Sequence, residues 1–374
     1  MNRLPTQWRS VSSRESQVKT TPNSHQLGLT LVELLVAMVI SLLITLAAIA
    51  ALTVSRQGFT TVDAASQLRD NGRFAVDLIQ RLGVQSGFKD ASFGGQLPTT
   101  NTPDRAPNIM GFTNSLISPS NPLNAATART TGSVGYGSDV LILRNQLVKL
   151  NSDPNSIEAD GSMIDCMGNN GGSPSHPRGT APATRDERMA SILSVAISKG
   201  EPSLMCATVQ SNGTISVPQP IIRGVENFQV LYGTEGVTAN IAPPATYGRT
   251  AGAPAPTTSA AWAAWWAALD QTPDTYLRAD QMTVPGDPVS TNANWRRVRS
   301  LRIGMILRGA PNSAQSSVAQ TLYPFGPGQS SSTGTKGSAM SSADDPGTIF
   351  TAPADGRLRQ VVTFTVHLRN SQSL

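Results

Sequence analysis

The feature that most constrains this chain is an apolar run near its N-terminus that carries no formal charge. Residues 34–54 are 21 residues rich in Leu, Ile, Val and Ala, and no proline interrupts them. At about 1.5 Å of rise per residue, a helix of this length spans roughly 30 Å, the thickness of a hydrocarbon core. We therefore expect one membrane-spanning helix over residues 29–54, surrounded by the lipid bilayer.

The residues before this run predict its orientation. Residues 1–28 hold four basic side chains and one acidic side chain, a net charge of +3. Because basic flanks favour the cytoplasmic side, we expect a cytoplasmic N-terminus and a periplasmic remainder. A cleaved secretory signal peptide is the alternative. Against it, the run is long for such a segment, and the nearby Ala-x-Ala match at Ala48 lies inside the run.

The same charge distribution argues against a nucleic-acid-binding protein. The whole chain has a net charge of +5, from 29 basic and 24 acidic side chains. Without the +3 of residues 1–28, the rest of the chain carries only +2. Bulk charge of this size does not imply attraction to nucleic acid.

Glu33 stands at the start of the apolar run. A carboxylate there is costly in lipid, so it predicts a functional partner. If the chain is cut after Gly28, the new α-amino group of Leu29 lies four residues before Glu33, on the same helical face. Between subunits, such an amine can meet a neighbour's carboxylate. The alternative is a carboxylate that only caps the helix N-terminus, where the helix dipole favours negative charge.

Helical periodicity continues beyond the apolar run. Apolar and small residues recur at steps of three and four, which predicts an amphipathic half of the helix over residues 55–82, with its stripe packed on a core. The alternative is two helices separated near Gly58, because glycine weakens a helix interior. The predicted stripe consists of Phe59, Val62, Ala65, Leu68, Gly72, Ala75, Val76, Ile79 and Leu82.

The N-terminal motif resembles that of a known family. Gly28-Leu-Thr-Leu-Val-Glu33, followed by the apolar helix, is similar to the class III signal of type IV pilins and type II secretion pseudopilins. The resemblance implies that prepilin peptidase cuts between Gly28 and Leu29, that the Leu29 amine is methylated, and that Glu33 assists docking into the filament. Residues 1–28 would then be a cytoplasmic leader. It is longer than most and lacks the usual basic residue directly before Gly28.

A narrower resemblance, to the PilW-type minor pilins, covers most of the chain after Leu29. The segment Asn71-Gly-Arg-Phe-Ala75 is similar to an ENGRFA-like segment of that family, and later blocks follow in the family's order. The cysteine that often follows the first helix in that family is absent, because residues 87–90 read Gly-Phe-Lys-Asp. The later blocks are residues 137–144, 202–206, 224–233, 297–303 and 361–370.

Residues 83–374 predict a head domain. Alternation of apolar and other residues is typical of strands in a sheet with one covered face, and the N-terminal helix is the expected cover. The expected fold class is α+β, pilin-like, with the long helix packed on an antiparallel sheet. Strands are expected around residues 140–143, 193–197, 228–232, 301–307 and 362–368.

Three long loops are also predicted in the head, at residues 83–136, 238–270 and 310–347. The second holds Trp262, Trp265 and Trp266, spaced i, i+3 and i+4. A short helix that packs its indoles on the head is favoured. The alternative is an exposed partner-binding patch, because clustered tryptophans often mark interfaces.

Cys166 and Cys206 are the only cysteines. An even count in a segment expected outside the cytoplasm favours one disulfide, with two free buried thiols as the alternative. Closing a loop of about 40 residues is worth roughly 4 kcal/mol in the chain-entropy model. The three histidines are scattered along the sequence, so no zinc site is expected.

No enzyme signature stands out. The sequence contains no P-loop, nucleophile elbow, H-E-x-x-H or Rossmann motif, so we expect neither a cofactor nor catalytic residues. Arg296, Arg297, Arg299 and Arg302 form a basic cluster near a strand start. A solvated strand edge is favoured over a contact with DNA or lipid.

These observations predict a minor pilin of a type IV pilus in a Gram-negative bacterium. We expect a single-pass inner-membrane protein that then joins the pilus, priming the filament or lying near its tip. The expected partners are other minor and major pilins, prepilin peptidase and the inner-membrane assembly platform. The nearest alternative is a type II secretion minor pseudopilin. An alternative of another class is a membrane-tethered periplasmic adhesin or hydrolase.

Overall fold

The structure of the chain is a computed structural model. The chain divides into two compact units, Met1–Arg56 and Gln57–Leu374. Gly28 and Leu29 lie outside the described residues, as do the three tryptophans of the predicted patch. The structure describes residues 30–88, 106–124, 126–148, 159–170, 188–210, 213–243, 272–314, 316–326 and 349–370.

One long helix, α1 (Leu31–Gln85), forms the N-terminal part of the described chain. It continues through Gly58 without interruption, so the alternative of two helices is wrong. It also runs three residues beyond the predicted end at Leu82. Its buried residues all lie in the C-terminal half, within the second unit; they are Ala64, Leu68, Gly72, Ala75, Ile79, Leu82 and Gly83.

The predicted apolar stripe was wrong at its start. Phe59 and Val62 are 75% and 70% exposed, and the buried face begins at Ala64. The prediction took three successive steps of three residues, from Phe59 to Leu68. Each such step falls about 60° short of a full turn, so Phe59 and Leu68 lie on opposite sides of the helix. Only the later part of the stripe therefore faces the core.

The head contains two main antiparallel sheets instead of the single sheet that was expected. The five-stranded sheet has the order β1-β4-β5-β6-β7, and the four-stranded sheet has the order β13-β10-β8-β9. The first consists of β1 (Ile109–Phe112), β4 (Val140–Asn145), β5 (Met189–Ser198), β6 (Glu201–Val209) and β7 (Gln219–Arg223). The second consists of β8 (Val225–Thr234), β9 (Thr275–Leu277), β10 (Val298–Arg308) and β13 (Arg359–His367).

Smaller elements surround these sheets. Two two-stranded ladders pair β2 (Ser115–Ile117) with β3 (Ala126–Ala128), and β11 (Gln320–Leu322) with β12 (Phe350–Ala352). Two short helices, α4 (Ala279–Met282) and α5 (Pro288–Trp295), follow β9. Strands β1 to β3 lie inside residues 83–136, so that segment is not the continuous loop that was predicted. Its short strands carry too few alternating residues to be recognised by period.

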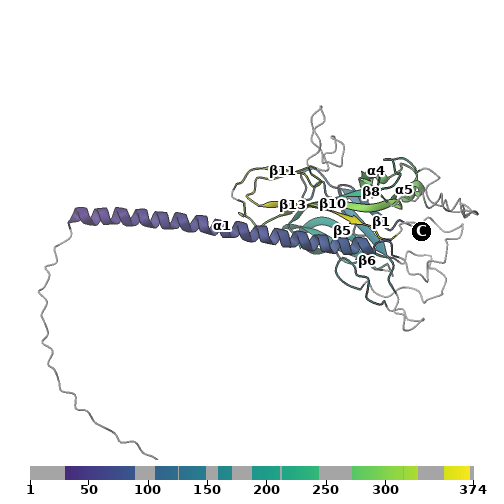
Figure 1. The fold of residues 1–374 in the computed structure, drawn as a ribbon, viewed down its shortest axis with the longest axis horizontal. Helices are drawn as coiled ribbons and strands as arrows, with labels where there is room; N and C mark the ends of the chain where they lie inside the picture. Colours follow the sequence, from purple (N-terminus) through teal and green to yellow (C-terminus); the bar gives the residue numbers. More distant parts are fainter. Residues whose placement is uncertain are drawn as a thin grey trace, which may run out of the picture. The chain divides into compact units, whose positions relative to one another are not determined.

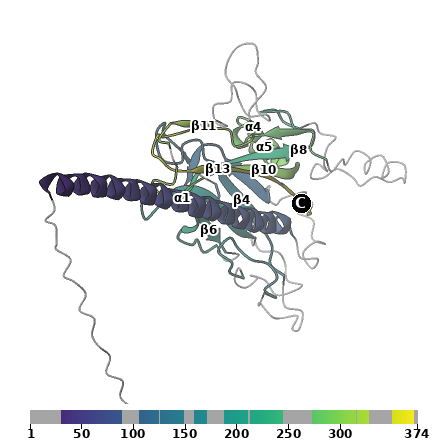
Figure 2. The same cartoon turned by 60° about the vertical axis from the view of Figure 1, so that its left-hand side comes forward.

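The main hydrophobic core lies where α1 and both sheets meet. Leu68 and Ile79 of the helix pack in one cluster with Leu193 of β5, Phe228 of β8 and Ile303 of β10. Both views show the C-terminal part of α1 running along the sheets (Figure 1, Figure 2). A second, smaller cluster covers the other face of the five-stranded sheet. The α+β class and the packing of the long helix on antiparallel sheets are confirmed.

Candidate functional site

The N-terminal end of α1 is closed by a reciprocal cap between Thr30 and Glu33. The backbone N–H and the hydroxyl of Thr30 both donate to Glu33 Oε2, each at 2.9 Å. In return, the Glu33 N–H donates to Thr30 Oγ1 at 3.3 Å. This is a capping box, which satisfies backbone donors that have no partner inside the helix. The capping alternative for Glu33 is therefore present in the structure, and a docking role stays a prediction.

The apolar half of α1 has the properties of a membrane span. Its length and composition suffice to cross a bilayer, and none of the side chains in its most apolar window is buried. Its polar side chains are satisfied within the helix: Ser41 donates to Met38 O at 2.9 Å and Thr53 to Ala50 O at 2.8 Å. Such bonds replace the water that a hydrocarbon core lacks.

Two glycines let α1 approach β13 closely. A Cβ added at Gly72 would lie 3.1 Å from Val362 Cγ2, and one at Gly83 would lie 2.5 Å from Val366 Cγ1. Side chains at these positions would hold the helix away from the strand. This contact gives a structural reason for the glycine of the Asn71–Ala75 motif: it is where the helix meets the sheet.

The C-terminal end of α1 is held by residues distant in sequence. The Asn370 side-chain amide donates to Val84 O and Ser86 O, both at 3.0 Å. These carbonyls have no partner inside the helix, so the side chain acts as a cap. The Gly87 N–H donates to Arg144 O at 2.9 Å, which ties the same end to the five-stranded sheet.

The structure contains the predicted disulfide between Cys166 and Cys206, with a Cα–Cα distance of 5.9 Å. Both cysteines are buried. The bond fastens residues 159–170 to β6, and the neighbouring Ile164 N–H donates to the Gln85 side chain at 3.2 Å. The disulfide thus also secures the C-terminal end of α1.

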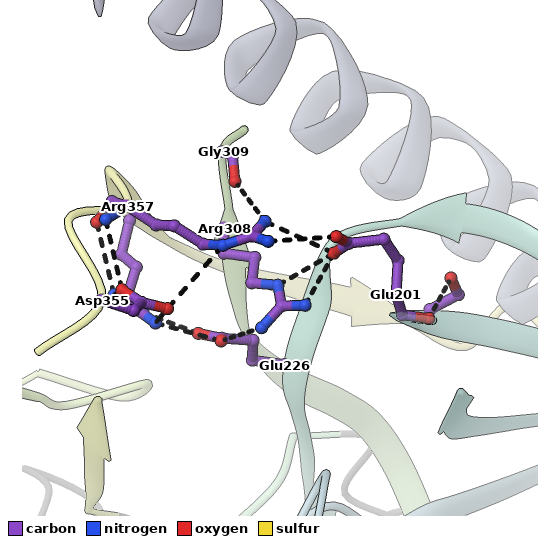
Figure 3. Close-up of polar contacts among 8 residues, drawn as sticks. Glu201, Glu226, Arg308, Gly309, Asp355 and Arg357 are labelled. Carbon is purple, nitrogen blue, oxygen red and sulfur yellow. Dashed lines mark hydrogen bonds and ion pairs between the residues drawn. The ribbon is translucent and has the colours of Figure 1, made fainter. Parts of the chain in front are cut away.

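An ion cluster, defined here as Glu201, Glu226, Asp355, Arg308, Arg357 and Arg359, joins the two sheets (Figure 3). Arg308 bridges Glu201 of β6 at 2.7 Å and Glu226 of β8 at 3.1 Å. Arg359 of β13 bridges Glu226 at 2.7 Å and Asp355 at 2.8 Å. Three cations and three anions balance the charge, which is what a partly buried cluster requires.

The environment of the cluster shifts its pKa values. Burial opposes ionisation of Glu201, but hydrogen bonds and charges from Arg308 and Arg357 outweigh it and lower the Glu201 pKa. The hydrogen bond from Arg359 is the main cause of the lowered Asp355 pKa. Burial alone would lower the Arg359 pKa, yet the hydrogen bonds that Arg359 donates to Asp355 and Glu226 raise it. These shifts keep Glu201, Asp355 and Arg359 charged at neutral pH.

The cluster lies next to the place where α1 enters the head. Arg357 Nη1 donates to Gly309 O at 3.0 Å, and a Cβ at Gly309 would lie 3.4 Å from the Ala64 side chain. Close by, the Thr61 hydroxyl donates to Ser313 O at 2.9 Å. The first buried turn of α1 therefore lies beside the ion cluster, which links both sheets.

The basic cluster predicted from sequence is part of the fold and not a solvated strand edge. It enters β10, which lies between β13 and β8, so the expectation of an edge was wrong. Arg299 forms an ion pair with Glu235 at 2.9 Å, and Arg297 donates to Gly236 O at 3.2 Å. Periodicity identified a strand here, but it carries no information on the order of strands in a sheet.

Sequence reasoning missed the ion cluster and a buried arginine, Arg129. Its guanidinium donates to Val195 O at 2.6 Å and to Ser115 O at 3.1 Å, which fixes the β2–β3 hairpin to β5. Burial lowers the Arg129 pKa to about 10, while Asp139 opposes the shift. The arginines near strand ends were the sequence signal that could have indicated these buried charged groups. Within the described residues, no group of three potential metal ligands comes together.

Two family models match the chain. A prokaryotic N-terminal methylation motif matches residues 23–49. Together with the long helix seated on antiparallel sheets, this match defines a membrane-anchored, pilin-like protein. A second model, type IV pilus-assembly protein W (PilW), matches residues 194–370. The two matches together fit a PilW-type, pilin-like protein with a role related to type IV pili. No curated protein and no solved structure matches the chain.

The region that the PilW model matches contains the ion cluster and residues that contact α1. Residues 194–370 contain every member of the ion cluster, both valines under the α1 glycines, and Asn370, which caps α1. The matched region thus includes several of the residues that hold the helix. A pilus-assembly family with an N-terminal prepilin motif has other pilus components as partners, and the description of the family is structural and not enzymatic.

Proposed function

We propose that this protein is a minor pilin that primes assembly of a type IV pilus and lies near the filament tip. Prepilin peptidase cuts between Gly28 and Leu29, and the new Leu29 amine is methylated. The protein waits in the inner membrane with its N-terminus in the cytoplasm, and then enters the pilus through residues 29–54. One observation carries this proposal. The same chain has a methylation motif, an exposed apolar helical segment without formal charge, and a head that the PilW model matches.

The capping geometry leaves room for the proposed docking role of Glu33. Both hydrogen bonds from Thr30 reach the same carboxylate oxygen, Oε2. Among the described residues, no hydrogen bond is made to Oε1. A neighbour's α-amino group can therefore bind Oε1 while Thr30 keeps Oε2, so docking and capping do not compete. In an apolar surrounding, such an ion pair is worth more than in water.

The size of the head supports a place near the tip. The unit that carries it spans Gln57–Leu374 and contains two main sheets. A head of this size crowds a repeating shaft but not a filament end. The PilW match favours the pilus over a secretion pseudopilus.

The proposal is tested first by mass spectrometry of the mature N-terminus. We expect a chain that begins at Leu29 and carries one added methyl group. A chain that retains Met1, or a cut at another bond, would contradict the minor-pilin function.

Paired variants separate docking from capping. Glu33→Ala removes both roles, whereas Thr30→Val removes the hydroxyl of the cap and keeps the carboxylate. If Glu33 docks subunits, E33A is cleaved normally but is lost from sheared pili, and T30V is incorporated like the wild type. Equal loss in both variants would show that capping alone explains the residue, and normal incorporation of E33A would contradict any assembly role.

A further inference from the structure

The outer edge of β13 differs from the other sheet edges in the described residues. β13 is the last strand in the order of its sheet and pairs only with β10. It is nine residues long, and residues 360–366 contain no proline and no charged side chain. The other edges are protected: β1 and β9 have four and three residues, and β7 has Pro220 and an irregular register. Long unprotected edges are rare because they invite strand pairing.

Along this edge, the backbone of β13 presents hydrogen-bonding groups that pair with no other described strand. Leu368 N–H donates to Arg299 O at 3.1 Å, and Gly309 N–H donates to Leu358 O at 2.8 Å. Between these bonds the register with β10 has no shift. Hydrogen-bonded pairs alternate in an antiparallel ladder, so the even-numbered residues bond to β10. The N–H and C=O groups of Val361, Thr363 and Thr365 therefore point away from the sheet.

Two exposed arginines of α1 follow its contact with β13 around the helix. Gly72 packs on Val362, and Arg69 and Arg73 lie about 60° and 100° around the helix from it, on the exposed side. Neither arginine forms an ion pair with a described carboxylate. Asp70 and Asp77 lie further round the helix, about 140–160° from Gly72. Arg69 and Arg73 are therefore the charged side chains of the buried half of α1 that lie closest in angle to its contact with β13.

We propose that the β13 edge receives an extended segment of a neighbouring pilus subunit, with acidic side chains on the face toward α1. This inference rests on the minor-pilin function proposed above. Arg69 and Arg73 are separated by about 6 Å along the helix, close to the roughly 6.7 Å between residues i and i+2 of a strand. An acidic residue at each of those two positions meets both arginines. Backbone hydrogen bonds supply affinity, and the arginines supply selectivity.

Site-resolved hydrogen exchange tests the edge directly. The full mature protein in detergent micelles is compared with the same protein in sheared pili. We expect the amides of Val361, Thr363 and Thr365 to exchange at least about tenfold more slowly in pili, because a new strand protects them. The amide of Phe364, which faces β10, should be protected in both samples and serves as the internal control.

Two variants probe the same edge. Thr365→Pro removes only an outward-facing N–H, which edge strands tolerate, and Thr365→Val is its matched control. Arg69→Glu combined with Arg73→Glu reverses the charge without touching the strand. We expect T365P and the double charge variant to lose the protection in pili, and T365V to keep it.

The outcomes separate this inference from the function on which it rests. A protein missing from pili altogether contradicts the minor-pilin function, and the edge proposal with it. A protein present in pili with fast-exchanging edge amides overturns the edge proposal alone. Slow exchange of these amides already in micelles would show that the chain covers its own edge, which also overturns it.

Discussion

Gly83→Ala should destabilise the head, although alanine is the better helix former. The added Cβ would lie 2.5 Å from Val366 Cγ1 and 3.5 Å from Val366 Cβ. Val366 is only 2% exposed and is paired with Leu301 of β10, so it cannot move aside freely. The helix must therefore rise from the sheet, or the valine must leave its preferred rotamer.

The magnitude follows from two opposing effects. Replacing glycine by alanine inside a helix gains about 1 kcal/mol. Overpacking a closed core costs about 1–3 kcal/mol. The expected net loss in the free energy of unfolding is therefore about 1 kcal/mol and at most about 2 kcal/mol. Gly72→Ala, whose added Cβ would lie 3.1 Å from its nearest neighbour, should leave the free energy of unfolding nearly unchanged.

Urea unfolding of the full chain in detergent, followed by circular dichroism, measures this effect. Gly58→Ala is the matched control, because no atom lies within 4 Å of its added Cβ. Val366→Ala in the Gly83→Ala background should recover part of the loss, giving a favourable coupling in a double-mutant cycle. Stabilisation by Gly83→Ala to the same extent as by Gly58→Ala would refute the close approach of α1 to β13.

Three further predictions concern the disulfide and the ion cluster, which stabilise the head. Replacing both Cys166 and Cys206 by serine should cost roughly 4 kcal/mol of unfolding free energy, the loop-closure value for their separation of 40 residues; an unchanged melting temperature under reductant would contradict it. Arg359→Met should cost about 3–5 kcal/mol because it leaves three carboxylates with only two arginines, whereas Arg359→Lys should cost less; equal losses in urea unfolding would argue against a role for charge. Because the pKa values of Glu201 and Asp355 are lowered on folding, their stabilisation is complete above their ordinary values of 4.5 and 3.8, and it is lost as the pH falls through the folded-state values. The melting temperature should therefore be flat near neutral pH and fall in this acidic range, less steeply in Arg359→Met.

The sequence predicted the elements that depend on local pattern. The uncharged run of residues 34–54 and the periodicity after it were sufficient for α1, because both properties are read within one segment. The strands at Val140, Phe228 and Ile303 were recognised for the same reason. The cysteine pair followed from count and expected compartment.

Features that depend on pairing between distant segments were beyond this reasoning. Alternation shows which residues share a face, but Leu193 and Phe228 gave no sign that they belong to different sheets. The interior position of β10 could not be read from its arginines. The ion cluster joins Glu201 to Arg357 across 156 residues, and no local pattern connects them. At the N-terminus, Thr30 was overlooked as the capping partner of Glu33, although the spacing of three residues was a usable signal.

The long-range contacts that hold α1 in the head have a consequence for folding during synthesis. The helix is synthesised well before Val362, Val366 and Asn370, which hold it, and the Asn370–Ser86 contact spans 284 positions. Contacts of such long range form late in folding. During synthesis the apolar face of residues 64–83 therefore lacks its β13 contacts until the strands before β13 have been translated. Strand β13 completes the binding of the helix to the head.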